Sequence, residues 1–460
     1  MDERKELLYK IIILTIPASI EFMLQAGLSY VDFIMVGQLG KDASAAIGLT
    51  QEVNFLLKGV LMAVGIGIVS YISIAMGMRK YDMVKRGSVQ AFFLAVITGG
   101  VLMIVALILA PALPGLLGAE ESIHAPAVAY FRIVYLSAVF TAFNMLLAAV
   151  LKGVGDMRTP MYVNGIISIA NVILNYFLIY DSRIVLVAGF RFPVWGAGLG
   201  VQGSAWGTAA ASVLGGVLMI VGVLKNPLVS PRREKFMPDP LIIRRIVFTA
   251  IPVLLSRSVT SIGRLFFTAF VVGLGTLSLA AHTVAFAAEG LCYMAVVGMQ
   301  AAATTLAGNC KGEGSQKKLD QLTRLSCILI GAFMSLVAIL MFVMARLIIS
   351  TLSTDPDVIQ IGTTLFRIVA FNEPIFAISV IMEGIFNGTG DTKSPFIIAV
   401  ITLWFVRVLG AWFAIYILGA GVYGAWVCMI AENTVRGAAL LVRYRLVHEK
   451  LIGGRLITNR

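Results

Sequence analysis

The sequence predicts an all-α polytopic membrane protein, and three observations support this fold class. The 460 residues are 59% hydrophobic and 13% charged, whereas a soluble chain carries about a quarter charged residues. Apolar runs long enough to cross a bilayer recur along the whole chain. In lipid the backbone must satisfy its own hydrogen bonds, and these runs are too long for barrel strands, so helices are expected.

We expect twelve membrane-spanning helices, connected by loops that alternate in charge. Seven groups of basic residues on one side hold 25 of the 36 Lys and Arg, while the other side holds Lys41, Arg183 and Arg191. Basic loops are cytoplasmic, so both termini are expected inside the cell, with the spans in the plasma membrane. The net charge of +12 is thus a topology signal, and no nucleic-acid partner is expected. The spans are expected to start near residues 11, 45, 88, 126, 160, 203, 246, 279, 325, 358, 396 and 422.

The spans divide into two similar six-helix repeats. A proline-rich basic linker, 225–245, separates an N-terminal bundle, 1–224, from a C-terminal bundle, 246–460. The halves match at an offset of 235 residues, most clearly where GVGDMRTP at 153–160 matches GTGDTKSP at 388–395. An even number of spans gives both halves the same orientation and predicts a cavity between them. This architecture is typical of transporters, so we expect neither an enzyme nor a bound cofactor.

Each GxGDxxxP motif predicts a loop followed by the start of a helix. The glycines allow the chain to turn, Asp156 or Asp391 can accept from free N–H groups, and Pro160 or Pro395 suits a first helical turn. We interpret both motifs as structural hinges in cytoplasmic loops.

Three polar side chains share one narrow face of the first span. At 100° per residue, Glu21, Gln25 and Asp32 fall within about 40° of one another. An aspartate at the centre of a membrane helix costs about 2.5–3.5 kcal/mol on insertion scales and is normally retained for function. Asp32 is therefore our main candidate for a carboxylate that exchanges a proton or binds a cation, and Glu21 is a weaker one. The alternative is that Asp32 is simply solvated near the outer interface.

A second polar stripe follows one face of the fifth span. Its members are Asn164, Ser168, Asn171 and Asn175. These side chains either form hydrogen bonds between helices or face Asp32 and Gln25 and complete an oxygen-lined ion site. Tyr130 in the fourth span is a further candidate for the wall of that site.

The C-terminal half contains charges of its own within predicted spans. They are Arg257, Arg264, Glu289, Glu373, Glu383, Arg407, Glu432 and Arg436. Glu432 and Arg436 stand four residues apart and are expected to pair. The remaining charges are interpreted mainly as structural ion pairs, with Glu289, Glu373 and Glu383 as weaker candidates for a second proton or cation site.

With Asp32, the paired halves and the doubled GxGDxxxP, the chain resembles the multidrug and toxic compound extrusion (MATE) family. The segment PASIEFMLQAGLSYVDFIMVGQLG at 17–40 looks like that family's first span. The resemblance covers essentially the whole chain and implies a V-shaped twelve-helix antiporter that exports small organic cations against inward H⁺ or Na⁺.

Among its subgroups, the chain looks closest to the prokaryotic ones, including the DNA-damage-inducible-F-like branch. That likeness implies an ion site in the N-terminal half and a first span that bends at Pro17. Some relatives carry an acid where Asn175 stands, and others use an acid in span seven, where this chain has Arg257 and Arg264 instead. The implied ion-binding residues are Asp32, Gln25, Tyr130, Asn171 and Asn175.

Two rival functions remain open at the level of sequence. A lipid-linked oligosaccharide or lipid flippase on a related fold would need a basic central cavity, which Arg257 and Arg264 could line. A membrane-embedded transferase would need a His/Asp or Asp-rich metal cluster, and the sequence offers no such cluster. We expect a monomeric exporter in the lipid bilayer, with Na⁺ or H⁺ as the coupling ion and no other metal.

Overall fold

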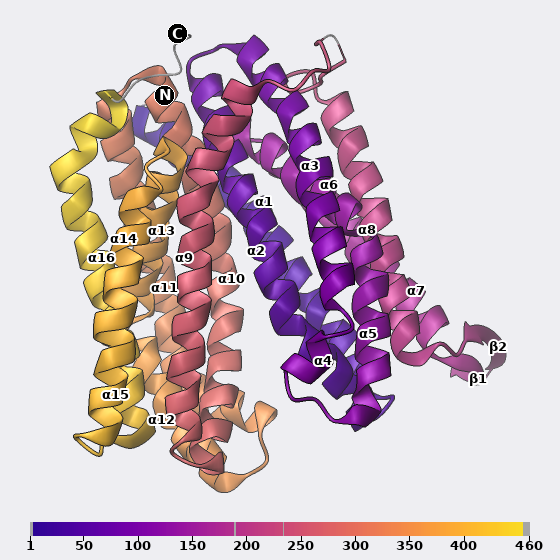
Figure 1. The fold of residues 1–460 in the computed structure, drawn as a ribbon. Helices are drawn as coiled ribbons and strands as arrows, with labels where there is room; N and C mark the ends of the chain where they lie inside the picture. The colour runs from indigo at the N-terminus through magenta and orange to yellow at the C-terminus, as the bar shows by residue number, and fades with distance from the viewer. Residues whose placement is uncertain (1–2, 188–189, 233, 454–460) are drawn as a thin grey trace. The chain divides into compact units, whose positions relative to one another are not determined.

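The computed structural model describes residues 3–187, 190–232 and 234–453. The first part of the chain forms α1 (Glu3–Gly37), α2 (Lys41–Gly77), α3 (Tyr81–Leu109), α4 (Leu113–Leu116), α5 (Glu121–Leu136), α6 (Ala138–Gly153), α7 (Arg158–Ile179), β1 (Asp181–Val187), β2 (Phe190–Ala197) and α8 (Gly200–Lys225) (Figure 1). The remainder forms α9 (Pro240–Val272), α10 (Thr276–Glu313), α11 (Gln316–Leu352), α12 (Pro356–Ala370), α13 (Glu373–Thr389), α14 (Lys393–Ile401), the π-helix η1 (Thr402–Val408), α15 (Leu409–Tyr416) and α16 (Gly421–Gly453). The terminal residues, expected in the cytoplasm, lie partly outside these ranges.

The helices confirm the predicted all-α polytopic fold class. Within the described ranges, nine helices are long and apolar enough to cross a membrane, and twelve spans result when three bent pairs each count as one. The bent pairs are α5 with α6 (51°), the two parts of α10 (41°), and α12 with α13 (54°). The antiparallel hairpin β1–β2, which the sequence did not predict, occupies the long loop after the fifth span.

Contacts divide the chain into two units. Unit 1 holds Met1–Ser19, Val69–Lys80 and Ile246–Arg460, and unit 2 holds Ile20–Ile68 and Tyr81–Arg245. Two early segments therefore pack with the later part of the chain. Ser19 donates a hydrogen bond to the carbonyl of Ala295 (3.2 Å), and Ser70 donates one to the carbonyl of Gly388 (3.2 Å). These units follow packing rather than the sequence repeat, so the division into halves at the 225–245 linker stays a prediction.

Small residues set the close helix packing in unit 2, where α7 lies against α8 and α3 against α6 (Figure 1). A Cβ atom on Gly203 would overlap the carbonyl of Leu178, and one on Gly207 would overlap the side-chain oxygen of Asn175. The absence of a Cβ at both positions lets α8 approach the polar stripe of α7. The fifth span is thereby held in one rotation about its axis.

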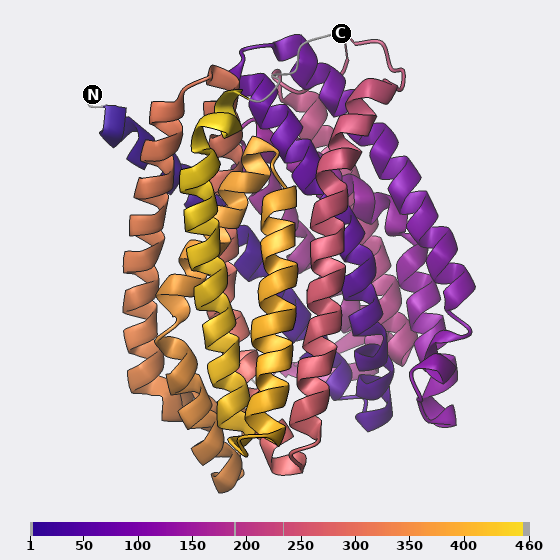
Figure 2. The same ribbon diagram turned by 60° about the vertical axis from the view of Figure 1, so that its left-hand side comes forward.

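Unit 1 is built around α10, which packs on α11, α12 and α13. Figure 2 shows α16, in yellow, running beside the orange α14 to α15. The apolar core of this unit includes the fully buried Trp426 and Phe366. Span eleven contains the π-helix η1, a geometry that is rare and frequent at functional sites.

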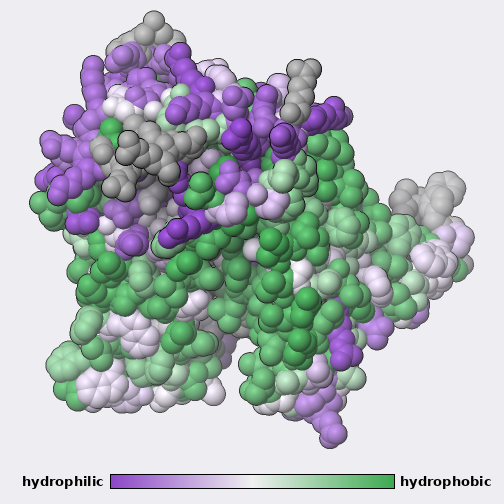
Figure 3. All heavy atoms as spheres, turned by 45° about the horizontal axis from the view of Figure 1, so that its top comes forward, coloured by the Kyte–Doolittle hydropathy of each residue, from purple (hydrophilic) through white to green (hydrophobic). Residues whose placement is uncertain are grey.

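The surface has the polarity that a membrane protein requires. In Figure 3, hydrophilic side chains gather in the upper part of the face shown, and hydrophobic side chains cover most of the area below them. Among the exposed apolar residues of the helices are Ile97, Ile104 and Ile108 of α3 and Ile169 of α7. Such side chains are suited to contact with lipid.

The two GxGDxxxP motifs form the predicted helix-starting loops. Gly155 and Gly390 have positive φ angles of 86° and 81°, which favour glycine. The Asp156 carboxylate accepts hydrogen bonds from the backbone N–H (3.0 Å) and hydroxyl (2.8 Å) of Thr159. The Asp391 carboxylate accepts the same two bonds from Ser394, at 3.3 and 2.7 Å. The predicted capping role of both aspartates is confirmed.

Candidate functional site

The candidate ion site is centred on Asp32 of α1 and Asn175 of α7. Asn175 Nδ2 donates a hydrogen bond of 2.7 Å to Asp32 Oδ1 and a second of 3.0 Å to Asn171 Oδ1. Asp32 is partly buried, whereas Asn171 and Asn175 are fully buried. The polar stripe predicted on the fifth span therefore faces Asp32.

The polar chain continues from α7 through α8 to α5. Asn171 Nδ2 donates to Thr208 Oγ1 at 3.3 Å, and Tyr130 hydrogen-bonds with Thr208. Tyr130 is buried. Sequence reasoning missed Thr208, because a single threonine in an apolar helix is an ordinary residue there.

Glu21 and Gln25 belong to a neighbouring polar cluster on the same face of α1. Gln25 Nε2 donates to Glu21 Oε1 at 3.4 Å. The same oxygen accepts from Lys152 Nζ at 2.8 Å and from Asn164 Nδ2 at 3.0 Å. Glu21 is only 1% exposed, so its negative charge is balanced inside the protein by Lys152. The structure thus gives Glu21 a structural ion pair, and Gln25 is hydrogen-bonded to it.

Pro17 lies within α1, which continues as one helix to Gly37. Proline has no N–H, so the carbonyl four residues earlier loses its intrahelical hydrogen bond. The boundary between the two units falls between Ser19 and Ile20, just after this weak point. A hinge at Pro17 stays a prediction.

Lys58 is a charged residue near the site that sequence reasoning overlooked. It stands next to Gly59, the middle residue of α2, and its side chain is exposed. A lysine at the centre of a membrane span costs about 2.5–3.5 kcal/mol on insertion scales. Lys58 borders a small cavity of about 30 Å³, and the described side chains show no ion pair between it and Asp32. The sequence does contain a sign of it, a single lysine inside a long apolar stretch. It was overlooked because only the basic residues in loops were considered.

An apolar groove runs beside the site, between α1 and α7. It has a volume of about 510 Å³, within the range of pockets for drug-sized molecules. Its lining residues are Ile20, Met23, Leu24, Gly27, Leu28, Val31, Ser168, Ile169, Val172 and Ile173. The helices that carry Asp32 and Asn175 therefore also carry a lipophilic surface.

Unit 1 places Glu289 and Glu373 at the breaks of two bent spans. Glu289 is the next-to-last residue before the 41° bend of α10, and Glu373 is the first residue of α13, directly after the 54° bend. Each glutamate has one buried carboxylate oxygen with no hydrogen-bond partner among the described residues. Both remain weaker candidates for a second cation site.

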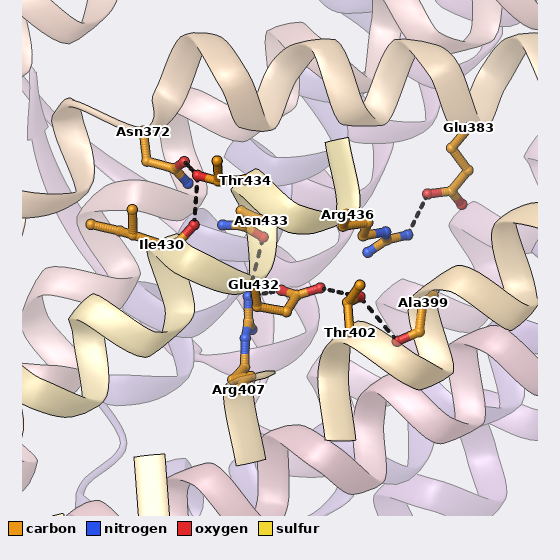
Figure 4. Close-up of polar contacts among 10 residues, drawn as sticks. All are labelled: Asn372, Glu383, Ala399, Thr402, Arg407, Ile430, Glu432, Asn433, Thr434 and Arg436. Carbon is orange, nitrogen blue, oxygen red and sulfur yellow. Dashed lines mark hydrogen bonds and ion pairs between the residues drawn. The ribbon is translucent and has the colours of Figure 1, made fainter. Parts of the chain in front are cut away.

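The expected pairing of Glu432 with Arg436 is wrong. Arg407 Nη2 donates to Glu432 Oε2 at 2.7 Å, and Arg436 Nη2 donates to Glu383 Oε2 at 2.8 Å (Figure 4). Thr402 supplies a further hydrogen bond of 3.0 Å to Glu432. Glu432 pairs with a residue of η1, and Arg436 pairs with a residue of α13. A buried charge requires a partner with good hydrogen-bond geometry, and these two helices provide one for each side chain. Glu383 is therefore a structurally paired carboxylate, as most of these charges were expected to be.

The oxygen atoms around Asp32 suit a small cation or a proton. One carboxylate, two amide oxygens and the hydroxyls of Tyr130 and Thr208 are hard ligands of the kind that alkali cations prefer. A lone carboxylate in such a place also accepts a proton. Together with twelve spans and broken helices, this arrangement defines the class of the protein, a membrane transporter.

The chain belongs to the MatE family, whose profile matches residues 17–177 and 252–413. The two matches begin 235 residues apart (252 minus 17), the offset of the sequence repeat. Over 96% of its length the chain is 27% identical to the probable multidrug resistance protein NorM of Thermotoga maritima, covering 93% of that protein. It is 24% identical to the multidrug export protein MepA of Staphylococcus aureus, covering 87% of this chain and 85% of MepA.

Solved structures show the same fold. The Vibrio cholerae MATE transporter VcmN in the bent form superposes with a TM-score of 0.87 at 21% identity, covering 98% of this chain and 99% of that one. A MATE structure in the straight conformation gives a TM-score of 0.87 at 22% identity, covering 97% of each chain. The family consists of membrane transporters, so the protein is not an enzyme.

Proposed function

We propose that this protein is a plasma-membrane antiporter that exports lipophilic organic cations, driven by inward H⁺ or Na⁺, with Asp32 as the coupling carboxylate. The observation that carries the proposal is the hydrogen bond from Asn175 to Asp32, part of a buried polar chain beside an apolar groove. The names of NorM and MepA, both multidrug proteins, support export of drugs. The basic loops support cytoplasmic termini.

The proposed mechanism is a competition for the negative charge of Asp32. A lipophilic cation gains from the apolar α1–α7 groove and from an ionised carboxylate nearby. Uptake of H⁺ or Na⁺ at Asp32 removes that attraction, and the drug leaves. Movement of α1 at Pro17 and rocking of the two halves would then expose the site to the other side.

The flippase alternative is disfavoured by the same observations. A pyrophosphate-linked substrate requires a basic cavity, whereas the wall of the groove is apolar and its neighbouring site contains a carboxylate. The family match, to MatE over both halves of the chain, also favours an exporter.

The test is Asp32→Asn in cells that lack other exporters and in proteoliposomes with separately imposed Na⁺ and pH gradients. We expect normal folding and loss of ion-driven efflux, because asparagine neither takes up a proton nor provides a charge for a cation. Asp32→Glu keeps the charge and should retain part of the activity. Full ethidium or norfloxacin resistance with Asp32→Asn would overturn the proposal.

A further inference from the structure

The linker between the two sequence repeats is fastened to α3 by a single side chain. Figure 1 shows this linker joining the end of α8 to the start of α9. Its last part, residues 234–239, is called the strap here and belongs to unit 2. Gln90 of α3 is buried, and its Nε2 donates to the carbonyl of Met237 at 3.1 Å. Its Oε1 accepts from the backbone N–H of Asp239 at 2.9 Å, so the strap is held on α3 at two backbone groups.

The strap also packs an aromatic ring on α3. The ring centroid of Phe236 lies 5.0 Å from that of Phe93 and 5.9 Å from that of Phe92. Phe236 is nevertheless 57% exposed, and Met237 is 65% exposed. The exposed apolar side chains of α3 begin one helical turn after Phe93, with Ile97. The strap therefore extends the apolar surface of α3 toward the start of that helix.

The acidic side chains of the strap contact the protein, whereas the basic side chains face outward. Asp239 accepts from two backbone N–H groups in the first turn of α9, at 3.0 and 3.4 Å. The Glu234 side chain is 20% exposed, and its carboxylate lies 3.9 Å from Nε of Arg86. Lys235 is exposed, and so is Arg232 just before the strap. The outer face of the strap thus combines positive charge with exposed apolar side chains.

We propose that the outer face of the strap is a docking surface for anionic phospholipid of the cytoplasmic leaflet. The proposed topology places this basic end of the helices on the cytoplasmic side, where the negatively charged lipids lie. Phe236 and Met237 enter the boundary between head groups and acyl chains, and Lys235 and Arg232 reach the phosphates. The inference goes beyond the proposed transport activity and uses only its topology.

Two features favour lipid over a soluble protein or a second copy of this chain. The exposed apolar side chains continue those of α3, a helix long and apolar enough to cross the membrane. The accompanying charge is positive, which complements anionic head groups but would repel the same face of another copy. An irregular segment cannot satisfy its backbone in the hydrocarbon core, so the strap belongs at the interface.

The first test uses the detergent-solubilised wild type and needs no variant. Thermal unfolding is followed while phosphatidylglycerol, or phosphatidylcholine with the same acyl chains, is added. We expect phosphatidylglycerol to stabilise the protein more, and we expect high salt to weaken the difference by screening the head-group contacts. Equal stabilisation by the two lipids would overturn the proposal.

The second test assigns the lipid effect to the strap. Arg232→Gln combined with Lys235→Gln should raise the phosphatidylglycerol concentration for half-maximal stabilisation by roughly tenfold or more, because each basic residue near an anionic surface contributes severalfold. The matched control is Arg445→Gln combined with Lys450→Gln, which removes two exposed charges from α16. That control should keep the wild-type response. Equal losses in both double variants would refute a specific docking surface.

The third test reports the position of the strap directly. A nitroxide label is attached to Met237→Cys after the four native cysteines are replaced, and the protein is placed in nanodiscs that contain phosphatidylglycerol. Oxygen should reach the label more readily than a water-soluble nickel chelate does. Adding Gln90→Leu removes both hydrogen bonds to the strap and should expose the label to the chelate. A label that is open to the chelate even with Gln90 present would contradict the proposal. These measurements do not involve transport, so they are independent of the role given to Asp32.

Discussion

Asn175 commits both of its amide hydrogens, one to Asp32 Oδ1 at 2.7 Å and one to Asn171 Oδ1 at 3.0 Å. This fixes the orientation of the amide, and Asn175 Oδ1 is left buried without a partner among the described residues. The amide therefore donates to the carboxylate and keeps one oxygen that can still accept. Because a protonated Asp32 keeps one oxygen that can accept, the bond from Asn175 is compatible with proton uptake in the proposed mechanism.

Replacement of Asn175 by alanine should uncouple the site while the fold is retained. A hydrogen bond to a charged group contributes about 1.5–3 kcal/mol, which corresponds to roughly a tenfold to hundredfold change in ion affinity. We expect ion-driven efflux to fall accordingly in proteoliposomes. The matched control is Ser335→Ala on α11, since that hydroxyl donates to the carbonyl of Gly331 (2.7 Å) on its own helix, away from the site. Equal losses in both variants would contradict the role given to Asn175.

Helical periodicity placed Asp32 and the asparagines of α7 each on one face of a helix, and one of the two alternatives it left open, that these faces meet, is confirmed. Both residue sets repeat at helical spacing within long apolar helices, where polar side chains must find partners. The capping by Asp156 and Asp391 was also predictable, because it depends on residues three positions apart in sequence. These features depend on helical periodicity or on residues close together in sequence, so they can be predicted from a single sequence.

The partners that come from distant helices could not be predicted in this way. Thr208 reaches the site only because α8 packs in a particular rotation, which the sequence pattern does not specify. The partner of Glu432 was predicted wrongly for the same reason. Proximity in sequence suggested Arg436, whereas the partner is Arg407. Pro374, in the first turn of α13, was an available signal for the break in span ten.

Gly207→Ala should damage the ion site without removing any polar group. A Cβ atom at this position would overlap the Asn175 side-chain oxygen, so the amide must move away from Asp32. We expect reduced ion-driven efflux, with a smaller effect on expression. Gly100→Ala on α3 is the control, because a Cβ there meets nothing within 4 Å. That control should gain about 1 kcal/mol of helix stability, and a Gly207→Ala variant with full activity would show that the amide position is unimportant.

The buried pair of Glu21 and Lys152 should dominate the stability of unit 2. The Glu21 side chain is 2% exposed and that of Lys152 is 14% exposed, and removal of one partner from such a pair costs about 3–5 kcal/mol. Lys152→Met should therefore lower the melting temperature strongly. Adding Glu21→Gln should recover part of the loss, since no unpaired charge remains.

The exposed pair of Lys10 and Glu6 provides the control for that experiment. It has a similar N–O distance of 2.7 Å, but its side chains are 57% and 51% exposed. Lys10→Met should change the free energy of unfolding by less than about 1 kcal/mol. If Lys10→Met and Lys152→Met destabilise equally, burial does not set the strength of the inner pair.

Double-mutant cycles in unit 1 should separate the observed ion pairs from the pair that sequence spacing suggested. The cycle of Arg407→Met with Glu432→Gln should give a coupling of about 1–3 kcal/mol, as expected for buried residues in direct contact. Arg436 and Glu383, joined at 2.8 Å, should couple in the same range. Glu432 and Arg436 face different helices, so their effects on the unfolding free energy should add to within about 0.5 kcal/mol. A strong Glu432–Arg436 coupling would mean that α16 presents these side chains to one another, contrary to the contacts drawn in Figure 4.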